Sequence, residues 1–198
     1  AEEPQVEVRD SDLCTLACTG GTTGLPKQVM HTYKSILITA LNYMYIFSVR
    51  HEDVYLLATP FYWGLTESLL SGYLYMGCSI VILKEFTPSS VLEAIDKEKV
   101  TNSLLAPSFV PALASSPDVS KYDHSSLRRI VVGGASISGE GFKQAIKVFG
   151  NIFTLIYGAA EIVPLTHLPP EEIIFEGPQS GKASSCGKEA LSAEVRIV

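Results

Sequence analysis

The sequence predicts an α/β fold with a largely parallel sheet flanked by helices. Apolar runs of strand length alternate with segments of helical period along the 198 residues, which is the pattern of strand–helix–strand units. Helix-start signals such as Thr87-Pro88 and Ser138 stand at the joints between these segments. Gly77 and Gly150 follow two of the helical segments, where a C-terminal capping glycine is expected.

The expected elements follow the chain in order. Strands are expected at the short apolar runs, the first of them buried, namely Leu13–Cys18, Val54–Ala58, Ser79–Leu83, Ser103–Ala106, Arg129–Val132, Phe153–Tyr157 and Glu194–Val198. Helices are expected where apolar residues recur every three or four positions, namely at Thr32–Phe47, Leu65–Met76, Ser89–Glu98, Ser108–Ser115 and Gly139–Phe149. The segment from Pro169 to Ser185 is rich in Pro, Gly, Ser and Glu and predicts a loop or a subdomain boundary.

Composition restricts the class of protein. Apolar residues make up 46% of the chain and charged residues 18%, which predicts a globular protein with a real core. The formal net charge is −6, and Arg128-Arg129 is the largest basic cluster. We therefore expect no nucleic acid partner. The sequence carries no indication of an oligomeric state.

Cysteine usage and hydropathy bear on location. Cys14, Cys18, Cys78 and Cys186 form no CxxC pair, so we interpret them as buried, reduced thiols of an intracellular protein. The apolar stretch 36–49 is interrupted by polar residues and is short for a membrane span. We expect a buried amphipathic helix there and no membrane span.

The run from Thr19 to Lys27, Thr-Gly-Gly-Thr-Thr-Gly-Leu-Pro-Lys, has the composition of a phosphate-binding loop. Glycines let backbone N–H groups converge on an anion, hydroxyls add donors, and lysine adds a positive charge. A flexible surface loop is the alternative interpretation. A Walker P-loop is excluded because Pro26 precedes the lysine and Gln28 follows it. The same spacing disfavours a small-molecule kinase.

Two more glycine-bearing segments follow expected strands, where ligands of α/β sheets bind. The segment 132–136, Val-Gly-Gly-Ala-Ser, has small residues that let the backbone approach a flat group; a tight strand-to-helix turn is the alternative. The segment 156–161, Ile-Tyr-Gly-Ala-Ala-Glu, offers an aromatic ring that can stack on a purine and a carboxylate that can bind Mg²⁺. Taken singly, Tyr157 reads as a core aromatic and Glu161 as a solvated charge.

Together and in this order, the three segments resemble the adenylate-forming enzyme superfamily, which includes acyl-CoA synthetases, 4-coumarate–CoA ligases and beetle luciferases. Residues 16–27 resemble its phosphate-loop signature. Residues 121–128 followed by Gly133-Gly134-Ala135 are similar to the acyl-CoA synthetase and luciferase branch, and Cys186-Gly187-Lys188 resembles the downstream "VGK" segment. The resemblance covers nearly the whole chain.

The resemblance implies ATP, Mg²⁺ and coenzyme A as cofactor and co-substrates, and a small carboxylic acid as substrate. Lys27 and Glu161 would be catalytic, with Glu161 as the metal ligand while the carboxylate attacks the α-phosphorus. The product would be an acyl-adenylate plus pyrophosphate, and the acyl group would then pass to coenzyme A. The residues that would bind ATP are Thr19, Gly20, Gly21, Thr22, Thr23, Gly24, Lys27, Gly133, Gly134, Ala135, Ser136, Tyr157, Gly158 and Ala160.

The acid pocket is expected near residues 59–65, Thr-Pro-Phe-Tyr-Trp-Gly-Leu. This segment resembles the family stretch that carries an aromatic residue or a histidine beside the acyl tunnel. Trp63 would gate the pocket and Leu65 would line its wall. A packed core indole is the alternative for Trp63.

Two departures from the family pattern affect the expected activity. Ala160 stands where the family usually carries a threonine that contacts phosphate, and the absent hydrogen bond costs about ten- to a hundredfold in rate. The ribose-binding aspartate, the hinge and the small C-terminal domain with its catalytic lysine have no counterpart in 1–198. We therefore expect residues 1–198 to form part of an AMP-binding (adenylation) domain, inactive by itself, of a cytoplasmic or peroxisomal enzyme. A non-catalytic nucleotide-binding homologue and a luciferase-like oxygenase are the alternatives.

Overall fold

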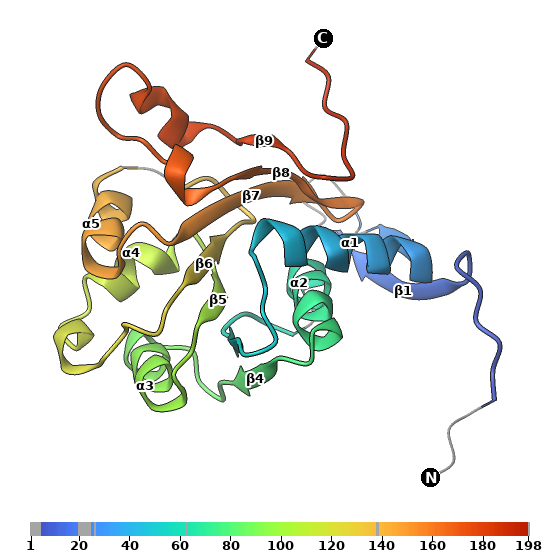
Figure 1. Ribbon diagram of the computed structural model, residues 1–198, viewed down its shortest axis with the longest axis horizontal. Coiled ribbons are helices and arrows are strands. Elements are labelled where there is room, and N and C mark those ends of the chain that lie inside the picture. Colours follow the sequence, from blue (N-terminus) through green and yellow to red (C-terminus); the bar gives the residue numbers. More distant parts are fainter. Residues whose placement is uncertain (1–4, 20–24, 26, 62, 138, 198) are drawn as a thin grey trace.

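A seven-stranded sheet with helices on both faces forms the body of the protein, and a separate two-stranded hairpin lies beside it (Figure 1). The computed structural model describes residues 5–19, 25, 27–61, 63–137 and 139–197. The predicted α/β architecture with a largely parallel sheet is confirmed.

The strand order of the large sheet is β4-β3-β5-β6-β7-β8-β9. The strands from β4 to β7 in this order are parallel neighbours, and β8 and β9 are added antiparallel at one edge. Their bounds are β3 (Val54–Leu57), β4 (Ser79–Ile82), β5 (Asn102–Leu105), β6 (Arg129–Val132), β7 (Phe153–Ala159), β8 (Ile162–Leu168) and β9 (Lys188–Glu189).

The five predicted α-helices form, and two of them begin with a side-chain cap, whereas the predicted start signal Ser138 lies outside the described residues. The Thr32 side chain accepts a hydrogen bond from the Ser35 N–H, and Thr87 forms a capping box with Ser90. Gly77 and Gly150 have the positive φ angles, 70° and 83°, that a helix stop requires. The helices are α1 (Tyr33–Ile46), α2 (Gly64–Tyr75), α3 (Pro88–Glu98), α4 (Phe109–Ala114) and α5 (Glu140–Phe149).

Two hydrophobic cores lie on the two faces of the sheet. Side chains alternate along each strand, so Leu56 packs into the core formed with α3, α4 and α5, whereas Tyr55 and Leu57 pack into the core formed with α1 and α2. All three side chains are buried. The alternation fixes which helices cover which face (Figure 1).

The strand predicted at Leu13–Cys18 forms as β1 (Leu13–Cys18), but the prediction that it is buried was wrong. Leu13 and Leu16 are 51% and 46% exposed, and Ala17 is the buried member. β1 pairs antiparallel with β2 (Gln28–Thr32) in a hairpin outside the large sheet, so only one of its faces packs on the protein. β2 was missed because polar residues interrupt its apolar pattern.

The prediction of a terminal strand at Glu194–Val198 was also wrong for residues 194–197, which are irregular, while Val198 lies outside the described residues. The sheet ends instead with β8 and β9. β8 was missed because Pro164 argues against a strand. The register with β7 is shifted near this proline, and bulges are where a strand tolerates it. The predicted loop 169–185 contains only short 3-10 turns, Pro170–Glu172 and Ser180–Ser184.

Cys78 is the buried cysteine, whereas Cys14, Cys18 and Cys186 are exposed and all four are free thiols. The expectation of buried thiols was therefore wrong for three of them, because β1 and the segment before β9 each leave one face to solvent. Within the described residues, the helices are all too short or too polar to cross a membrane.

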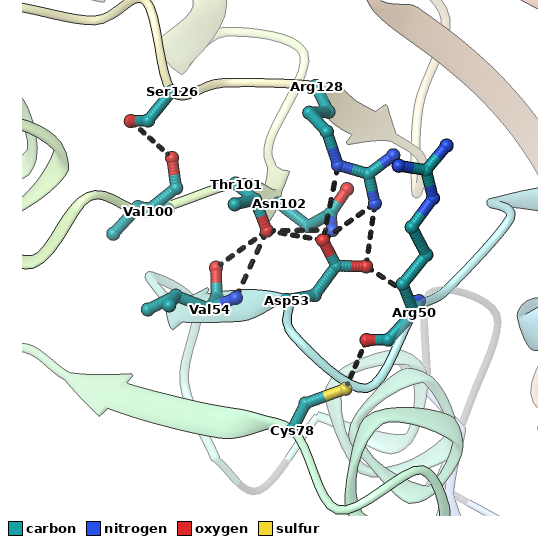
Figure 2. A network of polar contacts seen from close by, with 9 residues as sticks. All are labelled: Arg50, Asp53, Val54, Cys78, Val100, Thr101, Asn102, Ser126 and Arg128. Carbon is teal, nitrogen blue, oxygen red and sulfur yellow. Dashed lines mark hydrogen bonds and ion pairs between the residues drawn. The ribbon is translucent and has the colours of Figure 1, made fainter.

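A polar network joins the amino ends of three parallel strands (Figure 2). The glycine-bearing turns lie at the opposite, carboxyl ends of the strands. Asp53, just before β3, accepts hydrogen bonds from Arg128 Nη2 at 2.6 and 2.8 Å and from the Thr101 hydroxyl at 2.7 Å. Thr101 precedes β5 and Arg128 precedes β6. The network therefore fixes the amino ends of β3, β5 and β6 relative to one another and leaves their carboxyl ends available for a site.

Candidate functional site

A cavity of about 370 Å³ opens at the carboxyl ends of β6 and β7, the position where α/β sheets bind ligands. Three segments line it, one after β6, one at the end of β7 and one before β9. The lining residues are Val132, Gly134, Ala135, Ser136, Ile137, Leu155, Ile156, Tyr157, Gly158, Ala183, Ser184, Ser185 and Cys186.

The turn after β6 has two glycines for two different reasons. A side chain at Gly133 would bring its Cβ to 2.7 Å from Ile156 Cγ1, so only glycine lets the turn lie directly on β7. Gly134 has a φ of 92°, which other residues rarely adopt. Gly134, Ala135 and Ser136 are exposed toward the cavity and present backbone there. This geometry is suited to a flat group.

Tyr157 also lines this cavity and is 54% exposed. The alternative interpretation as a core aromatic was therefore wrong. Gly158 follows it, where a Cβ would lie 2.5 Å from the Ile162 carbonyl oxygen. The glycine permits the close approach of β7 and β8, and it also lines the cavity.

A second cavity, of about 460 Å³, adjoins the first. Trp63 lines it and is 42% exposed, so the alternative of a packed core indole was wrong. Residues 134–137 line both cavities, and Gly133 belongs to the second. The remaining lining comes from the end of β5 and from α4, namely Ala106, Pro107, Ser108 and Pro111.

Leu65 lies in the first turn of α2 and packs, partly buried, against the core formed with α1 and α2. Neither cavity has Leu65 in its lining. The structure thus separates Leu65 from Trp63, although the two are close in sequence, because the helix begins between them and turns their side chains to different surroundings.

The ends of the expected phosphate loop are held together in the β1–β2 hairpin. The Thr19 N–H donates to the Lys27 carbonyl at 2.9 Å, and the Lys27 N–H donates to Thr19 Oγ1 at 3.0 Å. The Lys27 side chain is exposed. Neither residue lines the two cavities. The predicted site residues Gly20, Gly21, Thr22, Thr23 and Gly24 lie outside the described residues.

Ala160 and Glu161 form the two-residue turn between β7 and β8, since Ala159 pairs with Ile162. Glu161 is exposed, and neither residue lines a cavity. Across the part of the chain that the structure describes, no three His, Cys, Asp or Glu side chains are grouped to hold a metal. A single carboxylate fits Mg²⁺, which is commonly held by one or two carboxylates while phosphate oxygens and water complete its shell.

The sequence interpretation missed the segment Ala183–Cys186, which lines the first cavity from a third side. Its loop-like composition pointed to a boundary, and Cys186, as part of Cys186-Gly187-Lys188, was the one residue of the segment that the resemblance singled out. It also missed residues 106–108. Their place directly after β5, at the carboxyl edge of a parallel sheet, is the signal that identifies them.

Comparison with known proteins identifies the family. A family model described as "AMP-binding enzyme" matches residues 1–198. The chain is 34% identical over 205 residues to 4-coumarate–CoA ligase 2 of Nicotiana tabacum, covering 98% of this chain and 37% of that protein. It is 33% identical over 172 residues to 2,3-dihydroxybenzoate–AMP ligase of Bacillus subtilis, covering 85% of this chain and 32% of that protein.

Among solved structures, the luciferase-like enzyme from the nonluminescent mealworm Zophobas morio superimposes with a TM-score of 0.79. The identity is 26%, and the match covers 93% of this chain and 43% of that one. The chain thus spans about a third of the length of the curated relatives it matches. The family model and the shared fold together show that this chain belongs to the AMP-binding enzyme family.

Proposed function

We propose that the complete protein activates a carboxylic acid with ATP and transfers the acyl group to coenzyme A. A carboxylate oxygen attacks the α-phosphorus, the bond to the β-phosphate oxygen breaks, and pyrophosphate leaves with its electron pair. The coenzyme A thiolate then attacks the acyl carbon of the adenylate and AMP leaves. Membership of the AMP-binding family and the likeness to proteins named as CoA ligases support this proposal.

The observation that carries it is the wall shared by the two cavities. Residues 134–137 line both, so a nucleotide in the first cavity and an acid in the second would be separated by one turn of chain. Adenylation joins two substrates, and holding them side by side in the reacting geometry lowers the entropic part of the barrier. Both cavities fall in the size range of small-molecule sites.

The residue roles follow from these positions. The adenine base of ATP would lie between the backbone of 134–136 and the Tyr157 ring. Trp63 would face the carboxylic acid substrate. Residues 19–24 and Lys27 would hold the β- and γ-phosphates. Mg²⁺ would supply charge neutralisation at the phosphates, and Glu161 would be its protein ligand. Such a reaction depends on positioning and on charge stabilisation rather than on a covalent residue.

The relatives support an aryl acid as the first candidate, because two of them are named for 4-coumarate and 2,3-dihydroxybenzoate; an aliphatic acid is the second. Their names also differ in the group that is joined to the acid, coenzyme A in one and AMP in the other. The adenylation step and the transfer to coenzyme A are therefore tested separately. An intracellular location, in the cytoplasm or the peroxisome, is consistent with the four free cysteines.

Exchange of labelled pyrophosphate into ATP, measured on the complete protein with a panel of aryl and aliphatic acids, tests adenylation. We expect exchange that depends on the acid and on Mg²⁺, and a CoA thioester detected by mass spectrometry when coenzyme A is added. No exchange with any acid, under conditions where ATP binds, would overturn the enzymatic proposal.

A second candidate, a nucleotide-binding protein without chemistry, is favoured by one observation. Ala160 lies beside Glu161 in the β7–β8 turn and offers no hydroxyl to phosphate. Ala160→Thr distinguishes the candidates. A slow enzyme should gain about ten- to a hundredfold in exchange rate from a hydrogen bond to a charged group. A binder should show tight nucleotide binding and no exchange in either form.

A further inference from the structure

We propose that the segment Ala183–Cys186 is the third side of the nucleotide cavity and that Thr166 is a positioning residue that holds it there. This inference rests on the proposed ATP site. Ala183 is buried, whereas Ser184, Ser185 and Cys186 are exposed, and all four line the same cavity as the turn after β6 and Tyr157. An adenine ring held between the turn after β6 and Tyr157 would leave its edge uncovered by these two. The segment Ala183–Cys186 would lie along that edge.

Thr166 connects the segment to the wall that carries Tyr157. In the β7–β8 ladder, Thr166 pairs with Tyr157, so the two residues are direct neighbours across the strands. The Thr166 hydroxyl donates to the Cys186 carbonyl oxygen at 2.5 Å, and Thr166 itself is buried. One residue therefore sets the distance between two sides of the cavity.

Gly187 brings the segment close enough for this bond. It has a φ of 84°, and a Cβ at this position would lie 2.0 Å from the His167 carbonyl oxygen. Only glycine lets the backbone approach β8 this closely. On the other side, the Ser185 N–H donates to the Lys182 carbonyl at 2.9 Å, and the Gly187 N–H donates to Ser185 Oγ at 3.0 Å. The segment is thus fixed at both ends.

Thr166→Val removes the hydroxyl and preserves the volume of the side chain. A single neutral hydrogen bond is worth about 1 kcal/mol, so we expect the KM for ATP to rise about 2- to 10-fold. The kcat at saturating ATP should change little, because the bound nucleotide restores the segment to its place. Thr166→Ser keeps the hydroxyl and should restore the KM.

Thr154→Val is the matched control. Thr154 lies on the neighbouring strand β7 and is fully buried, and its hydroxyl has no partner within the described residues. The same substitution there should leave the KM for ATP unchanged. A rise in KM that is equal in both variants, or a fall in kcat without a rise in KM in Thr166→Val, would show a general structural effect and overturn the proposal.

Cys186 supplies a second test that needs no variant. Cys186 is an exposed residue of the cavity lining, whereas Cys14 is an exposed residue of β1 and lies outside the lining. In the complete protein treated with N-ethylmaleimide, saturating Mg-ATP should slow alkylation of Cys186 at least about fivefold and leave that of Cys14 unchanged, measured by peptide mass spectrometry. The rate of modification follows access of the reagent to the thiolate.

The outcomes separate this inference from the function on which it rests. Protection of Cys186 together with the KM effect of Thr166→Val supports it. If ATP–pyrophosphate exchange is intact but Cys186 is alkylated at the same rate with and without ATP, the third side is overturned and the proposed function stands. If Mg-ATP does not bind, both are overturned.

Discussion

Thr19 and Lys27 hydrogen-bond to each other in both directions across the ends of the expected phosphate loop. The Thr19 N–H donates to the Lys27 carbonyl, and the Thr19 hydroxyl oxygen accepts from the Lys27 N–H at 3.0 Å. The side-chain oxygen of Thr19 is thus a closing contact of the loop, and its O–H hydrogen remains able to donate to a ligand. The geometry gives Thr19 a positioning role in addition to the expected contact with phosphate.

Thr19→Ala should loosen the loop and weaken the affinity for ATP. The loss of one hydrogen bond corresponds to about 2- to 10-fold in affinity. Thr19→Ser keeps the hydroxyl and should remain near the parent value. Isothermal titration with ATP, compared across the two variants, measures the effect. Equal affinity of Thr19→Ala and the parent protein would contradict the closing role.

Lys27→Ala should raise the KM for ATP and slow adenylation, because the proposed contact is a hydrogen bond from a cation to phosphate. Such bonds are worth about 1.5–3 kcal/mol, which corresponds to roughly 10- to 100-fold. Pyrophosphate exchange measures it. Lys34→Ala, an exposed lysine on α1, is the control and should exchange normally. Unchanged exchange in Lys27→Ala would count against its proposed role.

Glu161→Gln should weaken Mg²⁺-dependent turnover while the protein stays folded. The side chain is exposed in a two-residue turn, so the amide is accommodated without strain, but a neutral oxygen is a poorer ligand for a hard cation. Titration of exchange activity with Mg²⁺ should show a higher half-saturating concentration. Glu67→Gln on α2, also exposed, should titrate like the parent protein.

Trp63→Ala should change the preference among acids more than the affinity for ATP. The indole lines the second cavity and is absent from the lining of the first, so its removal enlarges the proposed acid pocket. The measurement is kcat/KM for a short and a bulky acid, together with the KM for ATP. A large effect on ATP alone would place Trp63 outside the acid pocket.

Asp53 should make the protein sensitive to acid. Burial raises its pKa, but the hydrogen bonds from Arg128, Arg50 and Thr101 outweigh burial, and the pKa lies below the usual 3.8. A carboxylate with a lowered folded-state pKa stabilises the fold above its unfolded-state pKa, and this contribution is lost as the pH falls through the folded-state value. We therefore expect the free energy of unfolding to fall below about pH 4.

Asp53→Asn tests this interpretation. It removes the charged acceptor of hydrogen bonds from Arg128, whose side chain is 32% exposed, which costs about 1.5–3 kcal/mol at neutral pH, and it should make the remaining free energy of unfolding less dependent on pH in the acid range. Urea unfolding between pH 7 and pH 3 provides both values. Asp96→Asn, in an exposed pair with Lys99, should leave stability and its pH dependence unchanged. If the free energy of unfolding falls with pH equally steeply in Asp53→Asn and in the parent protein, Asp53 is not the source of the acid sensitivity.

Local chemistry allowed much of the fold to be predicted. Thr87 before Pro88 marked a helix start because its hydroxyl caps an exposed N–H group. Gly150 marked a helix end because glycine adopts a positive φ. These effects act over a few residues, so they are visible in the sequence. The resemblance of the glycine-bearing segments to a known family supplied the candidate site residues.

Long-range contacts decided the rest. β2, β8 and β9 exist because of their partners across the ladder, and their own residues, such as Pro164, argue against strands. Leu13–Cys18 resembles a buried strand, yet it forms an exposed hairpin because nothing within the described residues covers its outer face. The place of Ala183–Cys186 beside Tyr157 depends on one hydroxyl and one glycine more than 20 residues apart.

The sequence by itself determined the alternation of strands and helices, the family, and the glycine-bearing turns, since each is encoded by residues that are neighbours along the chain. Only the tertiary structure decided which of these turns share a cavity, that Trp63 and residues 134–137 line the same cavity, and that Thr166 joins Tyr157 to Cys186. The reason is physical. A cavity is enclosed by segments that packing brings together, and the sequence of each segment carries little information about the others.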